Sequence, residues 1–152
     1  MEKVLISACL VGENCKYDGK NNYTKDVEKL FTLCDLVLIC PEQFGGLSTP
    51  RIPCEIKNGR VINKRGNDVT SKYKSGASLS LYIAKQNNVK YAILKERSPS
   101  CGVKQIYDGS FTSNVIKGKG VTCSLLEENG IQVFNEKEID KLVAILSATE
   151  NK

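Results

Sequence analysis

The sequence of 152 residues contains no histidine. Any general base must therefore be a carboxylate, a lysine, a tyrosine or a thiolate, and any metal site must rest on sulfur and oxygen ligands. No apolar run approaches the roughly 18 residues that a membrane span requires, and the apolar N-terminus lacks the basic leader of a signal peptide. We therefore expect a soluble protein of the cytoplasm.

Familiar cysteine and glycine motifs are also absent. The seven cysteines form no Cys-x-x-Cys pair, which excludes thioredoxin-like redox motifs and the usual zinc ribbons. The segment Gly118 to Gly120 has Cys123 where a dinucleotide fingerprint needs glycine, and no Walker lysine pattern occurs. Binding of nucleotide phosphates is therefore unsupported.

Charge and length are ordinary for a globular protein. The net charge is +5, from 22 basic and 17 acidic residues, and the lysines form no run of five or more. This pattern favours a solvated, mildly basic surface over a nucleic-acid-binding face. Without repeats or linkers, residues 1–152 are expected to form a single domain with its own core.

Three apolar runs that read as strands each lead to a cysteine. Residues 3–8 end at Cys9, residues 35–40 form a strand expected to be buried on both faces, and residues 89–94 lead into the turn that holds Cys101. The other expected elements are a helix over 25–33 capped by Thr24, a long functional loop over 41–53, an Asn-Gly hairpin over 55–62, a helix from Asp68 or Thr70 to about 87, an irregular segment over 106–120, a helix over 121–129, a strand over 131–134 and a helix over 136–148.

Alternating strands and helices predict an α/β fold with a mainly parallel sheet and helices on both faces. Ligands bind at the carboxyl ends of the strands in such sheets. Cys9, Cys40 and Cys101 should therefore lie together. Cys15, in the first loop, is either a fourth ligand or an auxiliary thiol, whereas the remaining cysteines are assigned to packing: Cys34, Cys54 and Cys123.

The residues by themselves fit two kinds of site. Soft thiolates without histidine favour zinc, copper(I) or an iron-sulfur cluster. A catalytic cysteine without metal would instead need a base, and the candidates near Cys101 are Glu42, Lys95 and Glu96. Both alternatives stay open at this point.

Three motifs in order resemble the thiouracil desulfidase family, formerly a family of unknown function. They are Ser-Ala-Cys-Leu at 7–10 with Tyr-Asp-Gly at 17–19, Cys-Pro-Glu at 40–42 with Gly-Gly-Leu-Ser-Thr-Pro-Arg at 45–51, and Ser-Pro-Ser-Cys-Gly at 98–102 with Tyr-Asp-Gly at 107–109. The resemblance covers nearly the whole chain. It implies a Rossmann-like three-layer fold, here with a mainly parallel four-stranded sheet plus a small β-hairpin.

The resemblance also implies roles for particular residues. Cys9, Cys40 and Cys101 look like the three ligands of an oxygen-sensitive 4Fe-4S cluster with one open iron site, and Glu42 and Ser98 look like the acid/base pair. The implied reaction is the non-redox conversion of 2-thiouracil to uracil and hydrogen sulfide. The partner would be a small thiolated base.

Two alternatives are retained beside this function. One is a desulfidase acting on 2-thiouridine in tRNA, which the mildly basic charge permits. The other is a non-catalytic module that binds a metal or sulfur through its cysteines. Within the desulfidase, Arg51, Lys95 or Arg97 would orient the base or support charge on the ring, or would simply lie on the surface.

Overall fold

A parallel sheet of four strands runs through the centre of the computed structural model, which describes residues 1–150. Its spatial order is β2-β1-β5-β8, and the strands are β1 (Lys3–Ser7), β2 (Asp35–Ile39), β5 (Tyr91–Leu94) and β8 (Gln132–Asn135). All neighbouring pairs are parallel, so the four carboxyl ends lie at one edge. The predicted α/β fold with a mainly parallel four-stranded sheet is confirmed.

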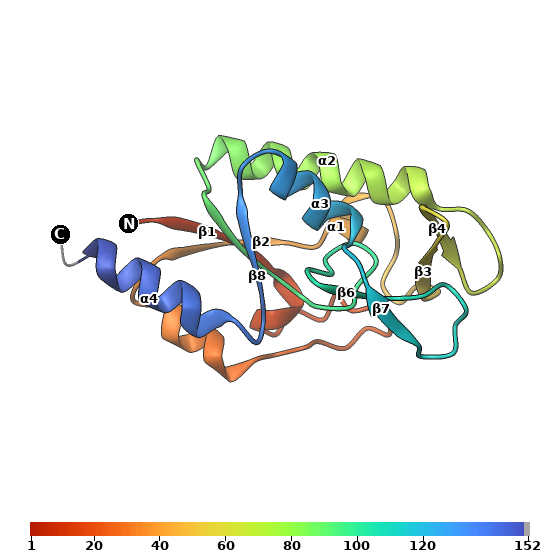
Figure 1. Cartoon of the computed structure of the whole chain (residues 1–152), viewed down its shortest axis with the longest axis horizontal. Coiled ribbons are helices and arrows are strands. Elements are labelled where there is room, and N and C mark those ends of the chain that lie inside the picture. Colours follow the sequence, from red (N-terminus) through yellow and green to blue (C-terminus); the bar gives the residue numbers. More distant parts are fainter. Residues whose placement is uncertain (151–152) are drawn as a thin grey trace.

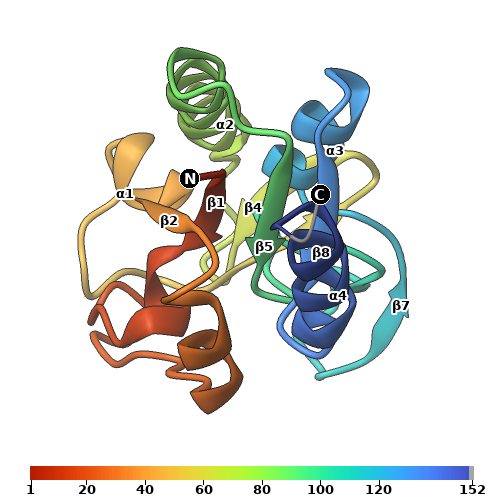
Figure 2. The same cartoon turned by 90° about the vertical axis from the view of Figure 1, so that its left-hand side faces the viewer.

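Helices cover both faces of this sheet (Figure 2). One face carries α2 (Thr70–Gln86) and α3 (Val121–Glu128), and the other carries α4 (Ile139–Glu150) with the 3₁₀ helix η2 (Lys25–Leu30). Alternate side chains of β1 enter the two cores: Val4 and Ile6 pack toward α4, and Leu5 packs toward α2 and α3. No helix among the described residues is long and apolar enough to cross a membrane.

Strand β2 is less buried than predicted. It was expected to be buried on both faces, but it lies at the edge of the sheet, and the Leu38 side chain is 41% exposed. A continuous run of branched apolar residues indicates a strand, but it carries no information on whether a neighbour lies on each side. The strand itself was predicted correctly.

Two helices have other bounds than predicted. The segment from Lys25 forms a short 3₁₀ helix, and the Thr24 hydroxyl donates to the carbonyl of Asn22 instead of capping the helix. Helix α4 starts at Ile139, because the side chain of Asn135 accepts a hydrogen bond from the backbone amide of Lys137 and holds a turn there.

Two antiparallel ribbons lie beyond the carboxyl end of the sheet, opposite the two chain termini (Figure 1). The predicted hairpin consists of β3 (Cys54–Lys57) and β4 (Arg60–Asn63), joined by Asn58 and Gly59, both with positive φ. The second ribbon pairs β6 (Gln105–Tyr107) with β7 (Val115–Lys117). The prediction of an irregular segment was wrong for these residues. Strands of three residues are too short to show a periodic pattern in the sequence.

The loop predicted over 41–53 begins with a short helix, α1 (Pro41–Phe44), which packs closely on α2. A Cβ atom on Gly76 would lie 1.8 Å from the carbonyl oxygen of Pro41, and one on Gly45 would lie 2.0 Å from that of Lys72. Only glycine therefore fits on either side of this contact. The contact fixes the start of α1, where the second cysteine of the site lies.

Candidate active site

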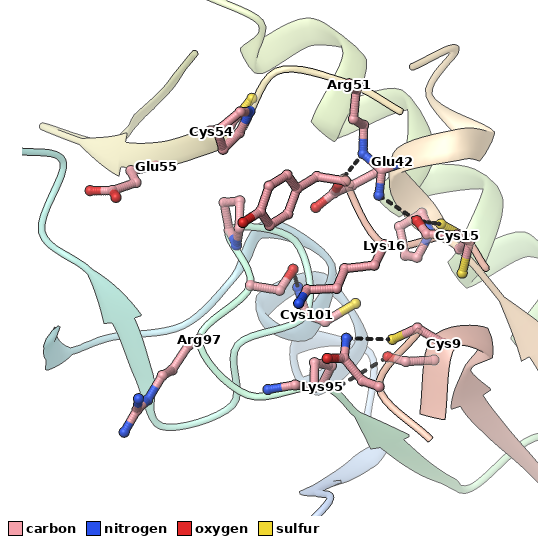
Figure 3. Close-up of a pocket in the computed structure, with 18 of the residues that line it drawn as sticks. Cys9, Cys15, Lys16, Glu42, Arg51, Cys54, Glu55, Lys95, Arg97 and Cys101 are labelled. Carbon is pink, nitrogen blue, oxygen red and sulfur yellow. Dashed lines mark hydrogen bonds and ion pairs between the residues drawn. The ribbon is translucent and has the colours of Figure 1, made fainter. Parts of the chain in front are cut away.

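Three thiols follow three neighbouring strands and line one cavity of about 480 Å³. Cys9 lies in the 3₁₀ helix η1 (Ala8–Val11) directly after β1, Cys40 lies between β2 and α1, and Cys101 lies in the loop after β5. The structure thus brings together the three cysteines that the sequence placed at this edge, two of which, Cys9 and Cys101, are labelled in Figure 3. No group of three His, Cys, Asp or Glu side chains within residues 1–150 is compact enough for a single metal ion.

A fourth thiol, that of Cys15, is buried between two of the three. It forms hydrogen bonds with the sulfur atoms of both Cys9 and Cys40. These bonds lower the pKa of Cys9, and they are the main reason why the pKa of Cys40 falls to about 7 despite burial. The pKa of Cys15 itself is raised, because its single S–H hydrogen is shared between the two neighbouring sulfurs and because the thiol is buried.

Other donors also surround these sulfur atoms. The side-chain amide of Asn22 donates to the Cys9 sulfur over 3.3 Å. Of the three cysteines, Cys101 is the most buried, and burial raises its pKa to about 12 although the Ser7 hydroxyl donates a hydrogen bond that opposes this effect. Asn22 and Ser7 were not predicted as site residues, because an isolated asparagine in a loop and a serine at a strand end are common without any site.

Glu42 reaches the cavity from the first turn of α1. Its Oε2 atom accepts a hydrogen bond from Nε of Arg51 over 2.6 Å, and the side chains are 13% and 6% exposed, respectively. Among the described residues, Oε1 of Glu42 accepts no hydrogen bond. One carboxylate oxygen is therefore held and the other is left for the cavity.

Ser98 lines the same cavity from the loop that carries Cys101. Its Oγ atom accepts hydrogen bonds from the backbone amides of Ser100 and Cys101 over 3.1 and 3.0 Å. Because these amides occupy the oxygen lone pairs, the hydroxyl hydrogen is available as a donor. The two predicted acid/base residues thus line the same cavity, one as an acceptor and one as a donor.

Glu96, the second carboxylate considered as a base, has no free oxygen. Its Oε1 atom accepts hydrogen bonds from the backbone amides of Val103, Lys104 and Gln105 over 2.7–3.0 Å, and Oε2 accepts one from the side chain of Asn135 over 2.7 Å. These bonds close the loop that contains Ser98 and Cys101. The geometry therefore makes Glu96 a structural carboxylate.

The two cations near this loop have different surroundings. Nζ of Lys95 lies 2.9 Å from Oε2 of Glu136 and donates to the carbonyl of Glu96, so the lysine is already paired. Arg97 is exposed, has a positive φ of 68°, and points away from the cysteines (Figure 3). Arg51 is the only one of the three candidate cations that contacts Glu42 among the described residues.

The remaining cysteines divide into two groups. Cys34 and Cys123 lie in the two cores, where burial raises the pKa of each, that of Cys34 to about 11. Cys54 was assigned to packing, yet it lines the cavity together with Glu55.

The Glu55 carboxylate accepts hydrogen bonds from the amides of Gly109 and Phe111 and so ties the two ribbons together. An acidic residue in a short hairpin is normally exposed, so no pattern marked Glu55.

The fold and the site define a Rossmann-like α/β protein with a thiol-lined cavity at the carboxyl ends of its parallel strands. Residues 4–138 match the family described as 2-thiouracil desulfurase, and the chain belongs to this family. The motif resemblance had predicted the same membership, which is confirmed.

Two relatives extend this comparison. The uncharacterized protein YbbK of Bacillus subtilis is 39% identical over 150 residues, covering 92% of this chain and 99% of the relative. The solved structure of the 4Fe-4S-dependent thiouracil desulfidase TudS is also 39% identical, covers 97% of this chain and 99% of its own, and superposes with a TM-score of 0.91.

Proposed function

We propose that this protein removes sulfur from a thiolated pyrimidine, converting 2-thiouracil and water to uracil and hydrogen sulfide. The family and the structural neighbour support this reaction class. Sulfur and carbon keep their oxidation states when C=S becomes C=O, so no electron is transferred. The observation on which the proposal rests is the free Oε1 of Glu42, an acceptor held in a cavity that three thiols line.

The residues fit a 4Fe-4S cluster held by Cys9, Cys40 and Cys101. Thiolates are the usual ligands of such clusters, the three cysteines come from adjacent strand ends, and the lowered pKa values of Cys9 and Cys40 favour their thiolate forms. When bound, a cluster with three protein ligands supplies an iron with an open coordination position, which is a Lewis acid for a soft thiocarbonyl sulfur.

The protein side chains would activate the water. Glu42 accepts a proton through Oε1 as the water attacks the thiocarbonyl carbon, because its other oxygen is held by Arg51. Ser98 donates its hydroxyl hydrogen to the water oxygen and so holds the water near Glu42. The carbon–sulfur bond would then break as the C=O bond forms, and the proton on Glu42 would pass to the departing sulfide. Glu42 would next take the second proton of the former water, which leaves with the sulfide as hydrogen sulfide.

The expected compartment and domain structure are compatible with this function. We place the protein in the cytoplasm, where thiols stay reduced, because all seven cysteines are unpaired in the structure. We also treat residues 1–152 as one catalytic domain.

The test is anaerobic reconstitution with iron and sulfide, followed by the loss of thiouracil absorbance. We expect turnover by the wild type, and retained iron with loss of turnover in Glu42→Gln. Exposed Glu128 supplies the matched control, because Glu128→Gln should leave both quantities unchanged. Protein that carries its cluster but leaves thiouracil and thiouridine intact would exclude this function.

The same assay separates free base from thiolated tRNA. The proposed substrate is the small thiolated base, so free 2-thiouracil should be consumed faster than 2-thiouridine in tRNA at equal concentration. Turnover of tRNA alone would show that the nucleic acid is the substrate. Colourless anaerobic protein with one zinc per chain would instead indicate a non-catalytic module.

A further inference from the structure

Arg51 contacts more of the site wall than an ion pair requires. Besides the 2.6 Å contact from Nε to Glu42, Nη2 donates to the carbonyl of Cys15 over 2.6 Å, and Nη1 donates to Oγ1 of Thr49 over 2.9 Å. A longer bond of 3.4 Å joins Nη1 to the carbonyl of Ser48. One guanidinium group therefore connects α1, the loop that follows α1 and the loop that contains Cys15 (Figure 3).

The backbone strengthens the same connection. The amide of Arg51 donates to the carbonyl of Tyr17 over 2.8 Å, so main chain and side chain both hold the first loop. The side-chain amide of Gln43 donates to Oγ1 of Thr49 over 2.7 Å, which links α1 to a second partner of Arg51. The guanidinium group is thus fixed relative to both α1 and the loop that contains Cys15 and Tyr17.

This arrangement favours an indirect role for Arg51. Four hydrogen bonds use four of its five N–H donors, so the group is committed mainly to the protein rather than to a bound ligand. A planar fork with fixed donor directions orients a carboxylate in a way that a lysine ammonium does not. The Glu42 carboxylate is held through Oε2, and this contact determines where Oε1 lies.

We infer that Arg51 is a positioning residue, which directs the free oxygen of Glu42 into the cavity by anchoring the carboxylate to the carbonyl of Cys15. The inference rests on the proposed function, since it assigns Arg51 to the base of that reaction. Its effect should appear in the rate of the chemical step more than in substrate binding. Misplacement of a reacting group by about 1 Å can cost on the order of 10²-fold in rate.

The first measurement compares Arg51→Lys and Arg51→Gln with the wild type, each reconstituted anaerobically. Both variants should carry as much iron per chain as the wild type, with the same visible absorption of the cluster. We expect kcat to fall on the order of 10²-fold in Arg51→Gln, and clearly in Arg51→Lys, while KM stays within about twofold. Exposed Arg65 supplies the controls Arg65→Lys and Arg65→Gln, which should match the wild type.

The second measurement is a double-mutant cycle between Arg51 and Glu42. If Arg51 acts through Glu42, adding Arg51→Gln to Glu42→Gln causes no further loss of kcat. A merely structural role would multiply the two losses. Wild-type kcat in Arg51→Lys, multiplied losses in the cycle, or loss of iron in both Arg51 variants would each overturn the inference.

Failure of the proposed function has a different signature. Wild-type protein that loads its cluster and consumes no thiolated pyrimidine overturns the proposed function and the inference with it. An active wild type with multiplied losses in the cycle overturns the inference alone.

Discussion

The carboxylate of Glu96 should be a main source of stability for the loop that carries Ser98 and Cys101. One oxygen accepts four backbone hydrogen bonds, the longest of them 3.4 Å from the Arg97 amide. The other oxygen accepts the side-chain amide of Asn135, and the residue is 8% exposed. The substitution Glu96→Gln keeps the size of the side chain and removes its charge. It also places an amide donor opposite the Asn135 donor.

The expected loss follows from these bonds. A hydrogen bond to a charged group contributes about 1.5–3 kcal/mol and a neutral one about 0.5–1.5 kcal/mol. Four weakened bonds, one of them already long, and one donor facing another donor therefore predict a loss of about 2–4 kcal/mol from the free energy of unfolding. Asn135 cannot simply turn its oxygen toward the new amide, because that oxygen accepts from the backbone of Lys137.

The effect should depend on pH. Burial by itself raises the pKa of Glu96, but the hydrogen bonds from Gln105, Lys104, Asn135 and Val103 together outweigh burial, so the pKa is lowered. A carboxyl with a lowered pKa stabilises the folded state above its unfolded pKa, about 4.3, and this stabilisation is lost as the pH falls through the folded value. The difference between wild type and Glu96→Gln should therefore shrink in acid.

Urea unfolding followed by far-ultraviolet circular dichroism, under anaerobic reducing conditions, measures this difference at pH 7 and at steps below pH 4.5. Exposed Glu128 again supplies the matched control, and Glu128→Gln should unfold like the wild type. Equal stability of Glu96→Gln and wild type at pH 7 would refute the reasoning. So would a difference that persists undiminished in acid.

The other predictions concern the thiols and the helix contact. Cys9→Ala and Cys101→Ala should each abolish iron binding, whereas Cys123→Ala should keep the iron and cost about 1 kcal/mol of packing; iron analysis and urea unfolding decide this. Cys15→Ala should raise the pKa of the Cys40 thiol from about 7 toward its ordinary value, because Cys15 no longer donates to it. In cluster-free protein at pH 7, alkylation of Cys40 should therefore be slower in Cys15→Ala than in the wild type, and Cys15→Ser should slow it less. Gly76→Ala should destabilise the protein by about 1–3 kcal/mol and lower turnover, because the added methyl group displaces α1; normal stability and activity would contradict the proposed contact.

Local patterns predicted those parts of the fold that depend on neighbours in sequence. Runs of branched apolar residues marked the four strands, and Asn58-Gly59 marked the first hairpin. Because parallel strands share one carboxyl edge, these strands also predicted that Cys9, Cys40 and Cys101 would meet there. Much of the site's framework was therefore predictable without long-range information.

The parts that were not predicted depend on contacts between distant segments. Glu55 is buried only because the 109–111 backbone folds onto it. Cys15 was left open between a fourth ligand and an auxiliary thiol, because its own segment does not show how the first loop returns to the cavity. The exposure of Leu38 depends on the order of strands in the sheet, which its own segment does not contain. Arg51 was a candidate only, since nothing in its neighbours shows that it reaches both Glu42 and the first loop.

Three carboxylates line or support the cavity of a protein without histidine, and their hydrogen bonds separate their roles. Glu96 accepts hydrogen bonds through both of its oxygens, whereas Glu55 accepts two backbone amides through Oε1 alone. Glu42 is held through Oε2 by the Arg51 guanidinium and keeps Oε1 free. A base must have an oxygen available to accept a proton, which excludes Glu96. Of the other two, Glu42 follows Cys40 by two residues, and its ion pair with Arg51 keeps the free oxygen in one place.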